Sequence, residues 1–143
     1  MPAPIKLKII TPERLVLEQQ VDSVIAQGSE GEFEILPQHE PIIAALKIDV
    51  LRYRTGRDEN SAAVIGGVLE AHNDEITVLS DVAELDTEID IARANQAKMR
   101  AEAEKTQRTD KIEIYVSEMA IARAMARLKA ADLRQRRHKP HGG

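Results

Sequence analysis

The segment Asp86-Thr87-Glu88-Ile89-Asp90-Ile91-Ala92-Arg93-Ala94 separates two unlike halves of this 143-residue chain. The residues before it fall into short runs in which apolar and polar side chains alternate, the pattern of half-buried strands. The residues after it are rich in alanine and contain no proline or glycine before residue 140, which predicts helices. The segment must therefore begin a helix and join the two halves, and we expect a β domain at residues 1–85 and a helical domain at residues 86–143.

The first half carries the turn signals of an antiparallel β fold. Glycine, proline, asparagine and aspartate recur between its apolar runs, and no helical pattern separates the runs, so we do not expect a parallel α/β sheet. We expect about eight or nine short strands in a sandwich or barrel. Gly66-Gly67 interrupts one run and predicts a bulge or a close crossing of two backbones. The expected strands are residues 6–10, 15–17, 21–26, 33–35, 42–46, 48–54, 62–65, 68–71 and 76–79.

Two helices are predicted in the second half. Thr87-Glu88-Ile89-Asp90 resembles a capping box, in which Thr87 caps a helix that runs to about residue 108. Thr109-Asp110 offers a second N-cap, for a helix from residue 111 to about residue 137. Alanine-rich faces allow close packing as an antiparallel hairpin, but alanine buries little area, at roughly 25 cal/mol per Å². We therefore expect a weak hairpin that a partner can open. The expected inner faces are Ile89, Ala92, Ala97, Ala101 and Ala103 in the first helix, and Ile112, Val116, Met119, Ala122, Ala126 and Leu128 in the second.

The two halves also differ in charge. Residues 1–85 carry 15 acidic and 7 basic side chains, whereas residues 86–143 carry 9 acidic and 13 basic side chains. The basic residues gather toward the end of the second helix, where Asp132 is the only acidic residue after residue 118. A basic end on an acidic body indicates an anionic partner, which can be a protein, a nucleotide or a nucleic acid. Nucleic acid is the weakest of the three, because the chain is net acidic and no aromatic residue lies among these cations.

The composition removes several function classes. The chain has no cysteine, so it has no disulfide framework and no thiol chemistry. No segment approaches the roughly 20 apolar residues of a membrane span, so membrane association requires a partner. We find no Walker-type glycine loop, nucleophile elbow or Ser/His/Asp set, and the histidines show no ligand spacing. We therefore expect no catalytic residues, no metal site and no required cofactor.

Two stretches resemble signature sequences of a known family. Residues 28–41, Gly-Ser-Glu-Gly-Glu-Phe-Glu-Ile-Leu-Pro-Gln-His-Glu-Pro, are similar to the signature loop of the epsilon subunit family of bacterial F-type ATP synthases, although Glu34 and Gln38 stand where glycine is frequent. Gly-Gly-Val-Leu-Glu at residues 66–70 and Ile-Thr-Val-Leu at residues 76–79 resemble the second signature of its β half. With the helical half, the resemblance covers nearly the whole chain. It implies an N-terminal antiparallel β-sandwich followed by a C-terminal antiparallel two-helix hairpin.

The resemblance also implies a function. Members of this family lie in the central stalk, beside the gamma subunit and the ring of c subunits, on the cytoplasmic side of the cell membrane. They couple the rotor to the α/β catalytic head, and their C-terminal helices can extend toward the β subunits and inhibit ATP hydrolysis. By this resemblance the chain is a non-catalytic regulatory subunit that meets the membrane only indirectly. The alternative from another class is a stand-alone ATP-binding sensor that is not part of a motor.

One motif within the resemblance concerns nucleotide. Ile89-Asp90-Ile91-Ala92-Arg93-Ala94 is similar to the nucleotide-binding motif of several bacterial members, which implies ATP as a regulatory ligand. Guanidinium forks suit phosphate oxygens, and clustered arginines repel one another without an anion. The competing interpretation is that Asp90 caps a helix and that the arginines are solvated. The further positions that match the family's nucleotide site are Glu84, Arg100, Arg123 and Arg127.

The resemblance also implies two partner-binding surfaces. The β-half surface that faces the rotor would be shaped by Gly31, Leu36, Pro37 and His39. The second surface is the end of the last helix, where the resemblance implies docking on an acidic region of the β subunit through Arg134, Arg136 and Arg137. A solvated helix end whose cations complement the helix dipole is the simpler interpretation. A basic-tailed nucleic-acid adaptor is a third class, and it predicts DNA binding that falls steeply with salt.

Overall fold

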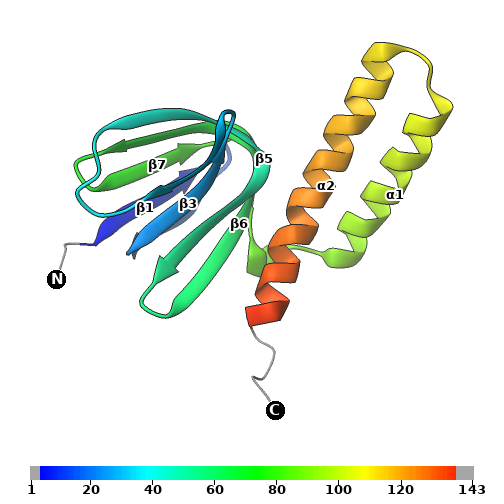
Figure 1. Cartoon of the computed structure of the whole chain (residues 1–143). Helices are drawn as coiled ribbons and strands as arrows, with labels where there is room; N and C mark the ends of the chain where they lie inside the picture. Colours follow the sequence, from blue (N-terminus) through cyan, green and yellow to red (C-terminus); the bar gives the residue numbers. More distant parts are fainter. Residues whose placement is uncertain (1–3, 138–143) are drawn as a thin grey trace.

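The computed structural model describes residues 4–137. These residues form eight strands, a 3-10 turn and two helices (Figure 1). The strands are β1 (Ile5–Ile10), β2 (Leu15–Val21), β3 (Ser23–Gly28), β4 (Gly31–Ile35), β5 (Ile42–Thr55), β6 (Asp58–His72), β7 (Glu75–Leu79) and β8 (Ala83–Leu85). The 3-10 turn η1 (Asp86–Glu88) leads to α1 (Ile91–Gln107) and α2 (Lys111–Arg137). The predicted fold class, an antiparallel β-sandwich followed by an antiparallel two-helix hairpin, is confirmed.

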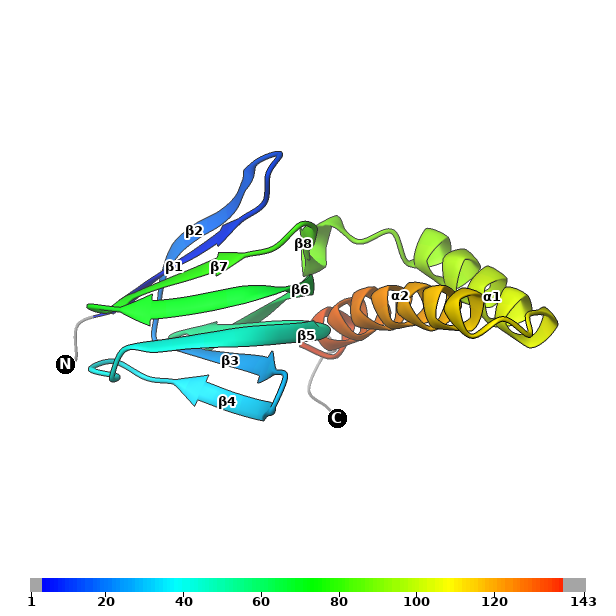
Figure 2. The ribbon, with the colours of Figure 1, turned by 90° about the horizontal axis from the view of Figure 1, so that it is seen from above.

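All of these strands belong to one hydrogen-bonded sheet that folds back on itself. Their order is β2-β1-β7-β6-β5-β3-β4, and β8 pairs with β6. Every pair is antiparallel except β1 with β7. Figure 2 shows β1, β2 and β7 on one side of β5 and β6, and β3 and β4 on the other. The two layers arise because β6 takes part in both, pairing with β8 through residues 62–64 and with β7 through residues 68–72.

The structure has two long strands, β5 and β6, where the sequence predicted four short ones at residues 42–46, 48–54, 62–65 and 68–71. The ladder continues through the glycine pair, since Leu46 pairs with Gly67. Gly66 and Gly67 have φ of 68° and 122°, so they bend β6 without ending it. A Cβ atom on Gly67 would lie 2.1 Å from the carbonyl oxygen of Leu79, which confirms the predicted close backbone crossing.

The core lies between the layers of the sandwich and is mostly aliphatic. Ile5, Leu7 and Ile9 of β1 are fully buried, while the lysines between them face outward, as the period-2 pattern predicts. Each fully buried aliphatic side chain stabilises the fold by about 1.5–3 kcal/mol. A second, smaller cluster joins the outer face of β5 and β6 to α2, through Val50, Ala63, Ala126 and Ala130. This cluster fixes the place of the helical hairpin.

The helical hairpin begins later than the sequence predicted. The predicted N-cap, Thr87, lies within η1, and Asp90 is the N-cap of α1 instead. Residues 86–88 cannot begin α1 because their carboxylates are held by distant groups, Asp86 by β6 and Glu88 by Arg14. The start of α2 is as predicted, since Asp110 Oδ1 accepts a hydrogen bond from the Ile112 N–H at 2.7 Å.

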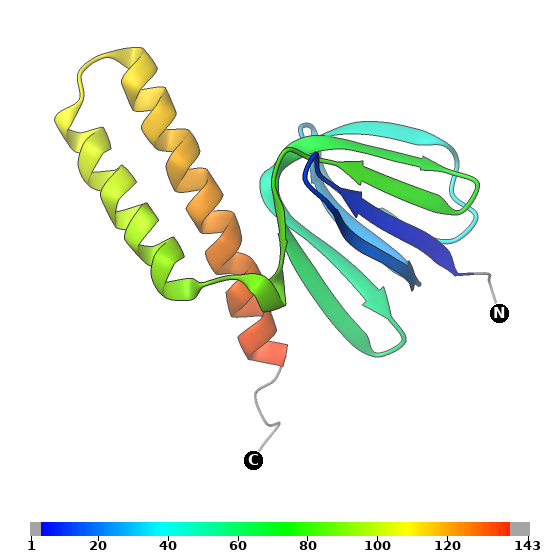
Figure 3. The ribbon, with the colours of Figure 1, turned by 180° about the vertical axis from the view of Figure 1, so that it is seen from behind.

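Figures 1 and 3 show α2 between α1 and the sandwich. Because α2 contacts both, its buried face consists of small residues that allow close approach on two sides. The predicted inner face of α2 is wrong in its first turns, because Ile112 and Val116 are 74% and 58% exposed. Neither α1 nor α2 is long and apolar enough to cross a membrane. The buried residues are Ala94 and Ala101 in α1, and Ser117, Ala124, Ala126, Ala130 and Ala131 in α2.

Candidate functional site

The linker between β8 and α1 lines a cavity of about 310 Å³. Its wall combines β8, η1, the first turns of α1 and one side chain from α2. Five of the residues that the sequence assigned to nucleotide binding are on this wall, namely Glu84, Asp90, Arg93, Ala94 and Arg127, whereas Arg100 and Arg123 are not. The lining residues are Glu84, Glu88, Asp90, Arg93, Ala94, Ala97 and Arg127.

Asp90 and Arg93 stand at the start of α1. The Oδ1 atom of Asp90 accepts a hydrogen bond from the backbone N–H of Arg93 at 3.1 Å, which satisfies one of the free N–H groups of the first turn. Among residues 4–137, the Arg93 guanidinium has no carboxylate within 4.0 Å. Asp90 therefore caps the helix, and the fork of Arg93 is available to an anion beside a helix N-terminus.

Arg127 reaches this wall from α2. Its Nε donates a hydrogen bond to Glu84 Oε1 at 2.8 Å, and the two side chains are 25% and 30% exposed. Glu88 is held in a similar way, because Nη2 of Arg14, in the β1–β2 turn, lies 2.6 Å from its Oε2. The hydrogen bond from Arg14 is the main cause that lowers the pKa of Glu88, and it also raises the pKa of Arg14. Each of these two carboxylates is thus already matched by an arginine.

Arg100 and Arg123 lie outside the cavity wall. Arg123 precedes Arg127 by about one helical turn and is half-buried, and among residues 4–137 it has no ion pair. Arg100 is exposed on α1, about two turns beyond Arg93. The structure therefore brings two of the four predicted arginines, Arg93 and Arg127, to one cavity.

Asp86, which the sequence did not single out, ties the linker to both the sandwich and α2. It is 4% exposed, and its Oδ2 accepts a hydrogen bond from the Ser61 N–H at 3.2 Å. Nη1 of Arg137 lies 3.3 Å from the same oxygen and also donates to the carbonyl of Glu59. Figure 3 shows the linker passing beside the end of α2. Burial, and then the charge of Asp86, raises the pKa of Tyr53 to about 12.

The three C-terminal arginines that the sequence grouped together have different environments. Arg137 faces the sandwich, as described, whereas Arg134 is exposed. Nε of Arg136 pairs with Asp132 on the same helix at 3.0 Å. A further cation of α2, Lys129, lies 3.0 Å from Asp49 of β5. The basic helix thus contacts the acidic half of its own chain.

The four residues expected to face the rotor are spread along β4 and the loop after it. Gly31 begins β4 with φ of 133°, and Leu36 follows its end with 54% of its surface exposed, so the two lie at opposite ends of the strand. Pro37 is half-buried, and Nδ1 of His39 lies 3.0 Å from the carbonyl of Glu40. No sequence pattern singled out Ile43, which is 75% exposed and lines the same surface hollow as Gly31.

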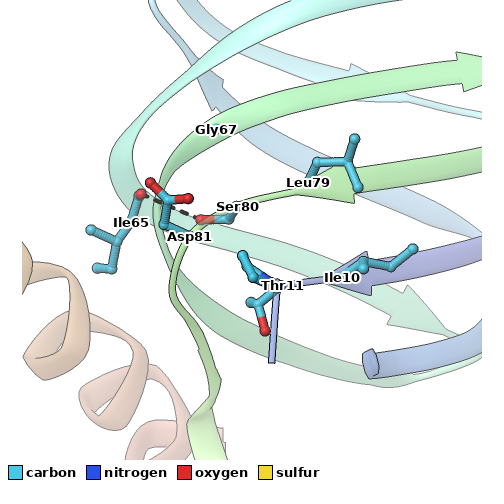
Figure 4. Close-up of a pocket in the computed structure, with 8 residues that line it drawn as sticks. Ile10, Thr11, Ile65, Gly67, Leu79, Ser80 and Asp81 are labelled. Carbon is cyan, nitrogen blue, oxygen red and sulfur yellow. Dashed lines mark hydrogen bonds between the residues drawn. The ribbon is translucent and has the colours of Figure 1, made fainter. Parts of the chain in front are cut away.

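Another cavity, of about 390 Å³, lies at the bend of β6 and contains none of the predicted site residues (Figure 4). Ser80 Oγ lies 2.9 Å from the carbonyl of Val82 and 3.3 Å from that of Ile65, so its hydroxyl supports the bend. Within residues 4–137, no three histidine, aspartate or glutamate side chains are placed to hold a metal ion.

Comparisons with known proteins agree with this architecture. The profile of the ATP synthase delta/epsilon chain beta-sandwich domain matches residues 4–86, and that of its long alpha-helix domain matches residues 87–132. The ATP synthase epsilon chain of Syntrophobacter fumaroxidans is 44% identical over 128 residues, which cover 90% of this chain and 96% of the relative. That of Moorella thermoacetica is 45% identical over 130 residues, covering 90% of this chain and 97% of the relative.

Solved structures show the same fold. A chain in the Euglena gracilis mitochondrial ATP synthase OSCP/F1/c-ring structure superposes with a TM-score of 0.77 at 24% identity, covering 92% of this chain and 82% of that one. A chain of the Tetrahymena thermophila mitochondrial ATP synthase central stalk and c-ring superposes with a TM-score of 0.61 at 15% identity, covering 88% of this chain and 95% of that one. Because both family domains match in order and the relatives match over nearly their whole length, the chain belongs to the delta/epsilon chain family of ATP synthases, among its bacterial epsilon chains.

Proposed function

We propose that the chain is a non-catalytic rotor subunit of a proton-translocating F-type ATP synthase, attached peripherally at the cytoplasmic side of the cell membrane. Its partners would be the gamma subunit and the c-ring through the sandwich, and the α/β catalytic head through the helices. The observation that carries this proposal is the match of both domains to bacterial epsilon chains at 41–45% identity. A chain of the same fold is present in the solved OSCP/F1/c-ring and central stalk/c-ring structures of mitochondrial ATP synthases, which supports the same placement.

Co-purification tests this assignment against a stand-alone sensor. The tagged full-length chain should isolate from native membranes together with gamma, the c-ring and the α/β head. Recovery of the chain alone would contradict the proposed subunit role and favour the sensor.

The proposed regulatory part is a helical arm that inhibits ATP hydrolysis. The support is that α2 is held to the sandwich by small residues and three ion pairs, Arg127–Glu84, Lys129–Asp49 and Arg137–Asp86. Contacts of this kind can be exchanged for an acidic partner, because alanine burial contributes little and the released cations keep their charge. In the complete enzyme, truncation after Leu85 should raise ATP hydrolysis. Unchanged hydrolysis would count against an inhibitory arm.

We also propose that ATP binds the cavity between the linker and the helices. Arg93 would take phosphate oxygens beside the N-terminus of α1, and Arg127 would join it by turning from Glu84. The second carboxylate oxygen of Asp90 would accept a hydrogen bond from the ribose or base. Because both helices contribute arginines, bound ATP would favour the docked arm.

Calorimetry on the full chain tests this site. ATP should bind at millimolar concentration or tighter, and Arg93→Ala or Arg127→Ala should weaken binding by about tenfold or more, the loss of one charge-assisted bond. Arg108→Ala is the matched control, since it makes the same charge change at the other end of α1. Equal weakening by all three variants would show general charge attraction, and absence of binding would remove the ATP proposal while leaving the subunit assignment intact.

A further inference from the structure

A second polar cavity, of about 340 Å³, lies where the end of α2 meets the β5–β6 hairpin. Four guanidinium groups line it, and Glu59 is the one carboxylate among its lining residues. The cavity is about 15 Å along α2 from Arg127, so it is distinct from the cavity at the hinge. The four arginines are Arg52 of β5, Arg57 of the turn, and Arg136 and Arg137 of α2.

Three of these arginines, Arg52, Arg57 and Arg136, have N–H groups that their ion pairs do not use. Arg52 meets Glu32 and Glu59 only at 3.5 Å, and Arg136 uses its Nε for Asp132. Among residues 4–137, Arg57 has no carboxylate within 4.0 Å. Since a guanidinium carries five N–H donors, the wall of the cavity offers more donors than its carboxylate can accept.

The fixed position of Arg137 adds to this arrangement. Its bonds to Asp86 and to the carbonyl of Glu59 hold the side chain at the junction of α2 and the hairpin. The end of a helix disfavours anions, because its last carbonyl groups point outward. A ligand must therefore carry several negative oxygens, each of which meets a guanidinium, to overcome that effect.

We propose that this cavity binds a small anion with more than one phosphoryl group, and that the bound anion holds the end of α2 against the sandwich. The volume lies within the roughly 300–1,000 Å³ of small-molecule sites. Donors come from both α2 and the β5–β6 hairpin, so the complete site exists only when the arm is docked. Occupancy therefore stabilises the docked arm by mass action. The proposal does not depend on ATP binding at the hinge.

Inorganic pyrophosphate is the probe, titrated calorimetrically into the full-length chain at low salt. Saturable binding is expected, and Arg57→Ala should weaken it by about tenfold or more. Arg57 lies in an exposed turn, so its replacement leaves the fold intact. Arg57→Lys keeps the charge but loses the guanidinium fork, so its affinity for pyrophosphate should lie between those of the unaltered chain and of Arg57→Ala.

Two controls separate this site from others. Arg54→Ala makes the same charge change on the same hairpin, outside the cavity wall, and should leave binding unchanged. Arg93→Ala alters the hinge cavity, where the proposed phosphate contacts would give a separate binding step, and it should leave the step that depends on Arg57 unchanged. Equal weakening by Arg54→Ala and Arg57→Ala would overturn the proposal, as would loss of binding with Arg93→Ala but not with Arg57→Ala. Absence of saturable binding would overturn it directly.

Amide hydrogen exchange tests the effect on the arm. At a pyrophosphate concentration tenfold above its Kd, the open fraction of the arm should fall about elevenfold, and exchange in the last turns of α2 should slow accordingly. Because Arg57→Ala weakens binding about tenfold, the same concentration should slow exchange in this variant only about twofold. Binding without any change in α2 exchange would show that the anion does not hold the arm.

Discussion

Replacing Asp86 with asparagine should release α2 from the sandwich while the sandwich stays folded. The Asp86 carboxylate is 4% exposed and accepts hydrogen bonds from Ser61 and Arg137. Asparagine has nearly the same shape, and its carbonyl oxygen can still accept from Ser61. The change therefore removes mainly the charge that holds Arg137.

The expected magnitude follows from this geometry. A hydrogen bond to a charged group contributes about 1.5–3 kcal/mol. Arg137 is 24% exposed, so water replaces part of the interaction, and we expect a loss of about 1–2 kcal/mol. That loss raises the open fraction, which is the fraction of molecules whose helical arm has left the sandwich, about 5- to 30-fold.

Amide hydrogen exchange, read separately for α2 and β1, measures this release. Exchange in the second half of α2 should accelerate by that factor, and exchange in the buried β1 should not change. Asp132→Asn is the matched control, because it removes the same charge from a pair with Arg136 in which both side chains are exposed. This variant should change the free energy of opening the arm by less than about 0.5 kcal/mol. Equal effects of the two variants would refute the reasoning, and faster exchange in β1 would show that Asp86 stabilises the whole fold instead.

Two further predictions concern the sandwich and its linker. Gly67→Ala should destabilise the chain by about 3–5 kcal/mol, because the new Cβ meets the Leu79 carbonyl, whereas Gly56→Ala, at φ of 61° in open space, should cost about 1–2 kcal/mol. Urea unfolding measures both, and equal losses would contradict the close crossing. Arg14 lowers the pKa of Glu88, so this pair stabilises the fold above the ordinary carboxyl pKa of 4.5, and its contribution is lost as pH falls through the lowered pKa. Arg14→Ala should return the pKa of Glu88 toward its ordinary value in a carboxyl NMR titration, and an unchanged titration would contradict the assignment.

Local signals in the sequence were sufficient to predict several helices and strands. The α2 helix has the predicted bounds, because an aspartate cap and an uninterrupted run without glycine or proline are both local features. The start of α1 was not predictable in the same way. Thr87 has the spacing of a cap, but Asp86 and Glu88 on either side of it are engaged by Ser61 and Arg14, far away in the chain. A capping pattern cannot show that such contacts hold the segment in a 3-10 turn.

The inner face of α2 shows a second limit of prediction from sequence patterns. Helical periodicity favoured the larger apolar residues Ile112 and Val116, but the buried residues are mainly alanines and one serine. The buried alanines Ala126 and Ala130 lie where α2 packs against β5 and β6, whereas the first turns of α2, which contain Ile112 and Val116, lie at the end of the hairpin away from the sandwich. Likewise, the i, i+4 spacing placed Arg123 beside Arg127, but only Arg127 reaches the cavity, where Glu84 holds it.

The contacts that hold α1 and α2 in place share one feature, which is that they involve acidic residues in or next to the linker. Acidic residues occupy every second position from Glu84 to Asp90, and each is bound to a different group: Glu84 to Arg127, Asp86 to Arg137, Glu88 to Arg14, and Asp90 to the first turn of α1. Two of these partners belong to α2, at points about 15 Å apart along the helix. Moving the arm must therefore free two carboxylates of the same short segment, of which Asp86 is buried. A ligand that draws Arg127 from Glu84 changes one of these bonds, whereas the proposed anion at the end of α2 holds the helix in the position in which the other bond forms. The linker is thus the element at which both proposed ligands would bias the position of the arm.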